Sequence, residues 1–168
     1  MPPFPTLPVY LPFPSSAGRL TVRIGPRFFA SLHRGSSTIA NAAATAENRR
    51  ERSKQLALAA ARTAEDNRGQ NIVVLDMRSM TTEFDYFVLV TGNSRRQLHA
   101  ISEEIDRVLE KDLDDHRMGI EGYNESRWIL LDYGTVVVHL FDAETREYYA
   151  LEDLWGQAAR LPLPWQKG

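Results

Sequence analysis

The segment 127–141 constrains the fold of this chain more than any other stretch. It consists of two apolar runs rich in β-branched residues, with Tyr133 and Gly134 between them. Two such runs on either side of a glycine-containing turn predict a tight β-hairpin at the centre of a sheet. Because central strands bury both faces, each polar or aromatic residue inserted there needs a hydrogen-bond partner or a role at the surface. The inserted residues are Trp128, Asp132, Tyr133 and His139.

Composition excludes several kinds of site. The 168 residues, 43% of them hydrophobic and 25% charged, are typical of one globular domain with room for a tail. The chain has no cysteine, which excludes disulfides, thiolate zinc sites and cysteine nucleophiles. No apolar run approaches the roughly 20 residues that cross a bilayer, so we expect no membrane partner.

Charge is distributed unevenly along the chain. Residues 1–46 carry four arginines and no acidic residue, whereas the remainder carries 16 basic and 22 acidic residues, a formal charge of −6. A phosphate backbone is bound through Lys and Arg, so an acidic body is a poor general binder of nucleic acid. It suits a basic protein partner better, because complementary fields favour encounter and register. We therefore expect a protein partner and no direct sequence-specific contact with nucleic acid.

The two ends of the chain are predicted to lie outside the folded domain, which we place at residues 47–157. Six of the nine prolines fall within the first 14 residues, and proline fixes φ and removes a donor, so residues 1–46 are predicted to be a disordered extension. Two interpretations of it remain open. A mis-called start implies a cytoplasmic protein, whereas the Arg- and Ser-bearing, acid-free composition is typical of a mitochondrial or chloroplast transit peptide. Residues 158–168 contain Pro162 and Pro164 and are predicted to be a flexible C-terminal tail.

Between these ends, helical and strand periodicities follow each other without regular β-α-β alternation. Helix-forming residues with one apolar face predict a helix over about 47–68, with Gly69 at its C′ position. Ser94 and Gln97 form a capping box that starts a second helix. The other predicted elements are strands at 72–77 and 85–91, a short edge strand or an extended loop within 117–123, the hairpin, and a short helix from Asp142. This mixture predicts an α/β (α+β) fold with a mixed β-sheet flanked by helices.

The start of the second helix is also a candidate anion site. Thr91-Gly92-Asn93-Ser94 joins a strand to a helix N-terminus, where backbone N–H groups are free, and Arg95 and Arg96 follow in the first turn. A nucleotidyl- or phosphoryl-transfer enzyme that uses Thr91–Arg96 is therefore the alternative function. Neither a P-loop motif nor GxGxxG is present, and a capped helix with a glycine turn explains the same residues.

The remaining acidic and histidine residues do not form a recognisable metal or catalytic site. The Asp-x-Asp of residues 112–115 closes a helix, where carboxylates are solvated and face the negative end of the dipole. The four histidines lack metal-ligand spacing, and His139 is expected to be structural. No catalytic serine motif is present. We therefore expect no catalytic residue, no cofactor and no metal. The histidines are His33, His99, His116 and His139.

Aromatic residues mixed with carboxylates are the other candidates for a site. Trp and Tyr beside acidic groups are typical of a protein-contact patch, in which aromatic side chains provide much of the binding energy. The alternative is that Trp128 and Trp155 simply complete the core. On an extended strand, residues 128 and 132 share one face and residue 133 lies on the other. The predicted partner-binding residues are Trp128, Asp132, Tyr133, Tyr149 and Glu152.

Several segments, taken together and in order, resemble the ribosomal silencing factors, also called the Iojap family. The resemblance covers about Gln55 to Trp155 and leaves residues 1–46 outside it, and Asn71 stands where the family often has Asp. The segments that carry it are Gly69–Ile72, Leu75-Asp76, Asp85–Phe87, Thr91–Ser94, Gly119–Gly122, Trp128–Gly134, Val136–His139 and Tyr149–Trp155.

The resemblance implies a translational repressor that is not an enzyme. The implied fold is related to nucleotidyltransferases but lacks their catalytic carboxylates. The implied partner is the large ribosomal subunit, bound through its fourteenth protein at the surface where the small subunit docks. A protein bound there would block subunit joining sterically. The resemblance also implies a homodimer when the protein is unbound.

Overall fold

The structure is a computed structural model that describes the backbone of residues 37–166 and the side chains of residues 44–166. Residues 1–36 of the predicted disordered extension therefore lie outside the described residues. The sheet and the helices packed on it belong to one unit, Glu47–Gly168, and the description below concerns that unit.

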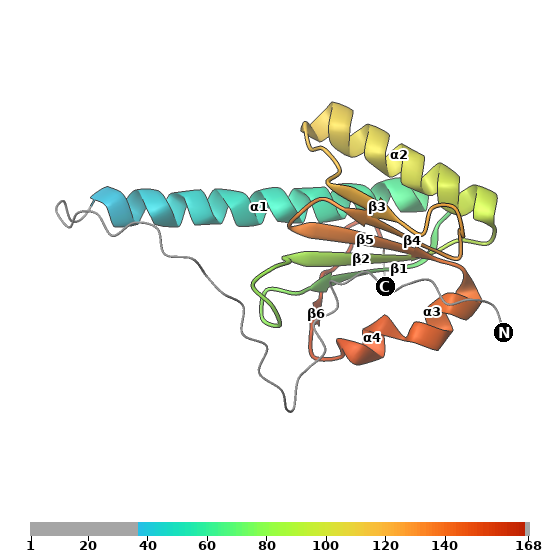
Figure 1. Ribbon diagram of the computed structural model, residues 1–168. Coiled ribbons are helices and arrows are strands. Elements are labelled where there is room, and N and C mark those ends of the chain that lie inside the picture. Colours follow the sequence, from blue (N-terminus) through green and yellow to red (C-terminus); the bar gives the residue numbers. More distant parts are fainter. Residues whose placement is uncertain (1–36, 167–168) are drawn as a thin grey trace, which may run out of the picture. The chain divides into compact units, whose positions relative to one another are not determined.

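The described residues form four helices and six strands (Figure 1). In chain order they are α1 (Ser37–Asp66), β1 (Gln70–Asp76), β2 (Tyr86–Thr91), α2 (Arg95–Leu113), β3 (Gly119–Glu121), β4 (Trp128–Asp132), β5 (Val136–Phe141), α3 (Ala143–Tyr149), α4 (Leu151–Leu154) and β6 (Ala159–Arg160). None of the described helices is long and apolar enough to span a membrane.

All six strands form one mixed sheet in the order β3-β4-β5-β2-β1-β6. β2 and β5 pair in parallel, and the other neighbours pair antiparallel. The predicted hairpin is β4–β5, with Trp128 opposite Phe141 and Asp132 opposite Val137. The mixed sheet flanked by helices is thus confirmed, with β5 and β2, whose residues are all buried, at its centre.

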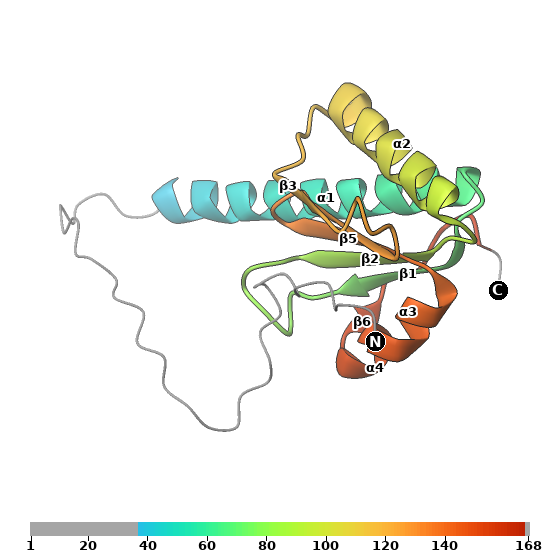
Figure 2. The ribbon, with the colours of Figure 1, turned by 45° about the vertical axis from the view of Figure 1, so that its right-hand side comes forward.

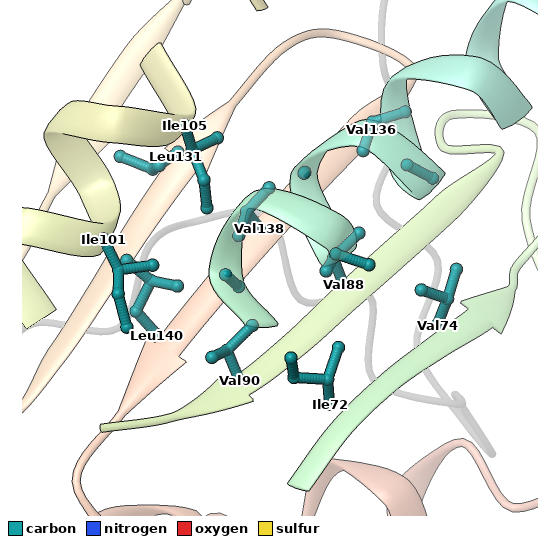
Figure 3. Close-up of a cluster of buried hydrophobic side chains, with 14 of the residues drawn as sticks. Ile72, Val74, Val88, Val90, Ile101, Ile105, Leu131, Val136, Val138 and Leu140 are labelled. Atoms are coloured by element: carbon teal, nitrogen blue, oxygen red, sulfur yellow. The ribbon is translucent and has the colours of Figure 1, made fainter. Parts of the chain in front are cut away.

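Each face of the sheet is covered by a different pair of helices. Figures 1 and 2 show α1 and α2 on one side, which we call the α1–α2 face, and α3 and α4 on the other, which we call the α3–α4 face. On the α1–α2 face, alternate strand residues such as Val88 and Val138 lie in one buried cluster with Ile101 of α2 (Figure 3). Ala60 of α1 belongs to the same cluster. Because successive side chains point to opposite faces, the other half of each strand meets α3 and α4.

The turn that joins α1 to β1 uses its residues differently from the prediction. Arg68, with φ +63, takes the left-handed C′ position that was assigned to Gly69. The N–H of Gly69 donates to the carbonyl of Ala64 at 2.7 Å and that of Arg68 to Glu65 at 2.8 Å, which is a Schellman ending. Gly69 is instead required by packing, because a Cβ there would lie 2.7 Å from Val90.

Two predicted boundaries differ in the structure. Residues 37–46 of the predicted disordered extension belong to α1, because the helix-forming, Ala-rich sequence continues upstream of Glu47. The segment predicted as a flexible tail is packed over its described part. Ala159 and Arg160 pair with β1, and Leu163 is buried against α1 in the core of the α1–α2 face. The prolines of this segment ended the strand but did not prevent its apolar residues from packing.

Candidate functional site

The hairpin places the predicted site residues on two different faces. Trp128 and Asp132 lie on the α3–α4 face with Leu130. Tyr133 belongs to the core of the opposite face, where it is only 5% exposed. Its hydroxyl donates to Asp106 of α2, and burial raises the pKa of this hydroxyl. Tyr133 therefore supports the hairpin from the α1–α2 face and does not join the surface formed by the other four residues.

Trp128 is anchored from below by His139 of the neighbouring strand. The indole Nε1–H donates to Nδ1 of His139 at 3.2 Å, and both residues are buried. Since Nδ1 accepts, the neutral ring carries its proton on Nε2, which has no partner in the described part of the chain. Burial lowers the pKa of His139 to about 3, so the ring is neutral at physiological pH. His139 is structural, as expected from the sequence.

Tyr149 of α3 covers Trp128 from the other side. The two ring centroids are 4.8 Å apart, and Phe141 lies 4.9 Å from the same indole. Trp128 is left with 8% exposure and Tyr149 is half-buried. Trp155, at 7% exposure, packs against Phe87 deeper in the same cluster. Both tryptophans thus complete the core, and Trp128 lies one layer beneath the surface through Tyr149.

The two carboxylates of the predicted site are already engaged within the fold. Arg146 donates to Glu152 from Nε at 3.0 Å and also from Nη2. Its Nη1 donates to the hydroxyl of Thr91 at 2.9 Å, which ties α3 and α4 to the end of β2. Asp132 accepts from the N–H of Gly134 at 2.7 Å and so fixes the hairpin turn. Glu152 therefore adds less free negative charge than the sequence suggested, whereas Asp132 forms no ion pair within the described residues.

The exposed part of this face comes from residues that the prediction missed. Tyr148 is 71% exposed and Leu154 46%, and both lie on the helices that cover the sheet. Glu147 and Asp153, their neighbours in the chain, are exposed and form no ion pair within the described residues. On a helix, Tyr148 and Tyr149 are 100° apart, so the two rings point in different directions, and in the structure Tyr148 is the exposed one. We call Glu147, Tyr148, Asp153 and Leu154 the outer patch.

The polar groups of Thr91, Asn93 and Ser94 in the alternative anion site are used by the fold. Ser94 accepts from the N–H of Gln97 at 3.2 Å, and Gln97 Oε1 accepts from the N–H of Asn93 at 2.7 Å. This confirms the capping box, with Asn93 in place of the cap residue as donor. Thr91 is 4% exposed and binds Arg146. Within the described residues, no group of three or more His, Asp or Glu residues is placed to hold a metal ion, and Asp114 of the Asp-x-Asp is the left-handed C-cap of α2.

The chain is similar to proteins of one family. A family model described as "Ribosomal silencing factor during starvation" matches residues 50–167. The ribosomal silencing factor of Bacillus subtilis is 42% identical over 106 residues, covering 62% of this chain and 88% of that protein. That of Halalkalibacterium halodurans is 37% identical over 111 residues, covering 66% and 93%. The chloroplastic Iojap protein of Zea mays is 33% identical over 108 residues, covering 64% of this chain and 46% of that protein.

Two solved structures share the fold. A crystal structure from Chromobacterium violaceum is 34% identical, with a TM-score of 0.59, and the match covers 61% of this chain and 85% of that one. A crystal structure from Bacillus halodurans is also 34% identical, with a TM-score of 0.58, and the match covers 66% of this chain and 99% of that one. These two proteins are therefore similar to this chain in sequence as well as in fold.

Proposed function

The chain belongs to the ribosomal silencing factor family, and on that premise we propose that it binds the large ribosomal subunit through the subunit's fourteenth protein and blocks joining of the small subunit. Membership of this family implies ribosome-associated regulation of translation. The partner and the steric mechanism are the proposal. It describes a binding protein with no catalytic step, rather than the alternative phosphoryl- or nucleotidyl-transfer enzyme.

The outer patch is the feature of the molecule that supports a basic protein partner. Tyr148 and Leu154 offer apolar area that no described element covers, and Glu147 and Asp153 add negative charge that no described cation neutralises. Aromatic anchors with an acidic border suit a partner surface of opposite charge. Ribosomal proteins that bind RNA carry such basic surfaces. The charge of the patch therefore fits the proposed partner.

The predicted site residues take supporting roles in this proposal. Trp128 and Tyr149 form the rigid layer beneath the outer patch, and Glu152 holds α4 in place through Arg146. Asp132 fixes the hairpin at the end of the same face. Contact with the partner is made by Tyr149 and the outer patch. Tyr133, on the opposite face, acts only by holding the hairpin against α2.

The other parts of the proposal concern assembly and compartment. We propose a homodimer in the absence of the ribosome and a silencing domain that runs from residue 47 through the packed segment 159–166, longer than the predicted 47–157. We propose a cytoplasmic protein. The alternative is an organellar location, which the chloroplastic relative suggests. Such a location would require a transit peptide within residues 1–46.

Subunit joining followed by light scattering tests this function. Saturating wild-type protein is expected to slow the joining of purified subunits, and Glu147→Lys with Asp153→Lys to abolish the effect. The control, Asp112→Lys with Glu125→Lys, makes the same charge change on exposed acids that form no ion pair in the described residues and is expected to behave as wild type. Equal joining rates with and without wild-type protein would refute the steric mechanism. Crosslinking to a different ribosomal protein would refute the named partner.

A further inference from the structure

Three arginines from separate parts of the chain form a basic edge of the molecule. Arg68 follows the end of α1 at the C′ position, and Arg95 and Arg96 begin α2. The side chain of Gln97 joins the two helix ends, because its Nε2 donates to the carbonyls of Asn67 at 3.1 Å and Arg68 at 2.9 Å. Figures 1 and 2 show the end of α1 and the start of α2 side by side in both views. We call Arg68, Arg95 and Arg96 the basic edge.

The guanidinium groups of the basic edge are free. All three residues are exposed, and none forms an ion pair within the described part of the chain. This contrasts with most arginines of the fold, which are bound to carboxylates. The bound ones are Arg52, Arg62, Arg78, Arg107, Arg117, Arg127 and Arg146.

The acids next to the basic edge do not cancel its charge. Asp142 and Glu144 lie at the same end of the sheet, since β5 ends at Phe141 and the carbonyl of Phe141 accepts from the N–H of Gly92. Both carboxylates are bound by Arg127, at 2.9 Å and 2.5 Å, which leaves these three residues a formal charge of −1 against the +3 of the basic edge. The edge therefore keeps a local positive charge on a body whose balance is acidic.

Local stability does not explain these arginines. Acidic residues favour the first turn of a helix, and α2 has none there but two arginines, which face the positive end of its dipole. Arg68 has a charge that suits the end of α1, but its left-handed backbone favours glycine. Residues that are unfavourable for the local structure, with no interaction that offsets the cost, are expected at functional sites.

We propose that the basic edge binds the phosphate backbone of ribosomal RNA, as a second contact beside the one made by the α3–α4 face; this rests on the proposed function. Guanidinium groups bind phosphate oxygens in a bidentate manner, and three free ones in one place give a local site for a folded polyanion. The contact reads no sequence. Because the body as a whole is acidic, attraction between this edge and RNA favours one orientation of the protein on the particle.

Salt dependence separates this proposal from the proposed function. The full chain, labelled with a fluorophore, is titrated with purified large subunits between about 50 and about 300 mM salt. For Arg68→Gln/Arg95→Gln/Arg96→Gln, the slope of log K against log salt is expected to be shallower than that of wild type by about 2 to 3. The control, Arg49→Gln/Arg50→Gln/Arg160→Gln, removes three exposed, unpaired arginines elsewhere and is expected to keep the wild-type slope. Circular dichroism verifies that both variants fold.

A protein-free RNA duplex of about 16 base pairs, labelled at one end, identifies the source of the anion. Wild type is expected to bind it weakly at low salt, and the basic-edge variant not to bind. Equal slopes for the two triple variants on subunits would overturn the basic edge while leaving the proposed function intact. A shallower slope on subunits without any binding to the duplex would assign the contact to an acidic protein and would also overturn the proposal. Failure of wild type to bind subunits at all would refute the proposed function itself.

Discussion

The indole N–H of Trp128 donates to Nδ1 of His139 across β4 and β5, 3.2 Å away, in the cluster beneath the outer patch. A neutral imidazole is required for this bond, because a protonated ring has no lone pair to accept it. The position of the aromatic layer under the proposed binding surface is therefore coupled to the protonation of one buried histidine.

Burial of the neutral His139 ring should make the folded state less stable in mild acid, where the unfolded chain takes up a proton at this residue. The folded-state pKa of about 3 lies below the unfolded value of 6.5, so the unfolded chain binds more protons between these pH values. The contribution to the free energy of unfolding is present above pH 6.5 and is lost as the pH falls toward 3, by up to about 1.4 kcal/mol per pH unit. Urea unfolding at several pH values measures it. In His139→Phe this part of the slope should vanish, and an unchanged slope would assign the titration to another group.

Trp128→Ala should destabilise the protein rather than report on binding. Trp128 is buried between Tyr149, Phe141 and His139, so truncation leaves a cavity and removes the bond to His139. We expect a loss of about 3 to 5 kcal/mol in the free energy of unfolding. Trp128→Phe keeps most of the volume and should lose markedly less. A fully stable Trp128→Ala variant would show that the aromatic layer is not part of the core.

Tyr148→Ser with Leu154→Ser should separate binding from stability. Both side chains are exposed, so we expect the free energy of unfolding to change by only about 0.5 kcal/mol per substitution. If the outer patch contacts the ribosome, affinity for purified large subunits should fall by about 2 kcal/mol or more, roughly thirtyfold. Met118→Ser, which removes the most exposed large apolar side chain outside the patch in the described part of the chain, is the comparison. Equal affinity for the double variant and wild type would remove the outer patch from the interface.

The sequence predicted the features that depend on local pattern. The hairpin, the mixed sheet and the capping of α2 by Ser94 follow from periodicity and turn chemistry over a few residues. The pairing of charges is not local. Glu152 looked available for a partner, but it binds Arg146 six residues away, and only folding shows this. The left-handed C′ position was likewise assigned to Gly69 because glycine favours that conformation, whereas the structure has Arg68 there. Gly69 is required by its close approach to Val90, which the local sequence does not show.

The face that a residue occupies was predictable, but its exposure was not. Strand alternation places Trp128 and Tyr133 on opposite sides, as found. Whether Trp128 reaches the surface depends on what covers it, and α3 is too short for its periodicity to reveal that Tyr149 does so while Tyr148 does not. The family resemblance pointed to residues of the α3–α4 face, whereas the outer patch is defined by exposure in the folded chain.

Gly122→Ala should disrupt the loop that leads into the hairpin. Gly122 has φ +67, and a Cβ there would lie 1.9 Å from the carbonyl oxygen of Trp128, so both the backbone and the packing oppose a side chain. The same loop is clamped to α2, since His99 Nε2 donates to the carbonyl of Tyr123 at 2.9 Å, and it has little freedom to shift. We expect a loss of more than about 2 kcal/mol in the free energy of unfolding. Gly119→Ala is the matched control, because the nearest atom to its Cβ would be 3.8 Å away, and it should cost less than about 1 kcal/mol. Comparable losses in the two variants, measured by urea unfolding, would mean that the close approach at Gly122 does not determine the loop.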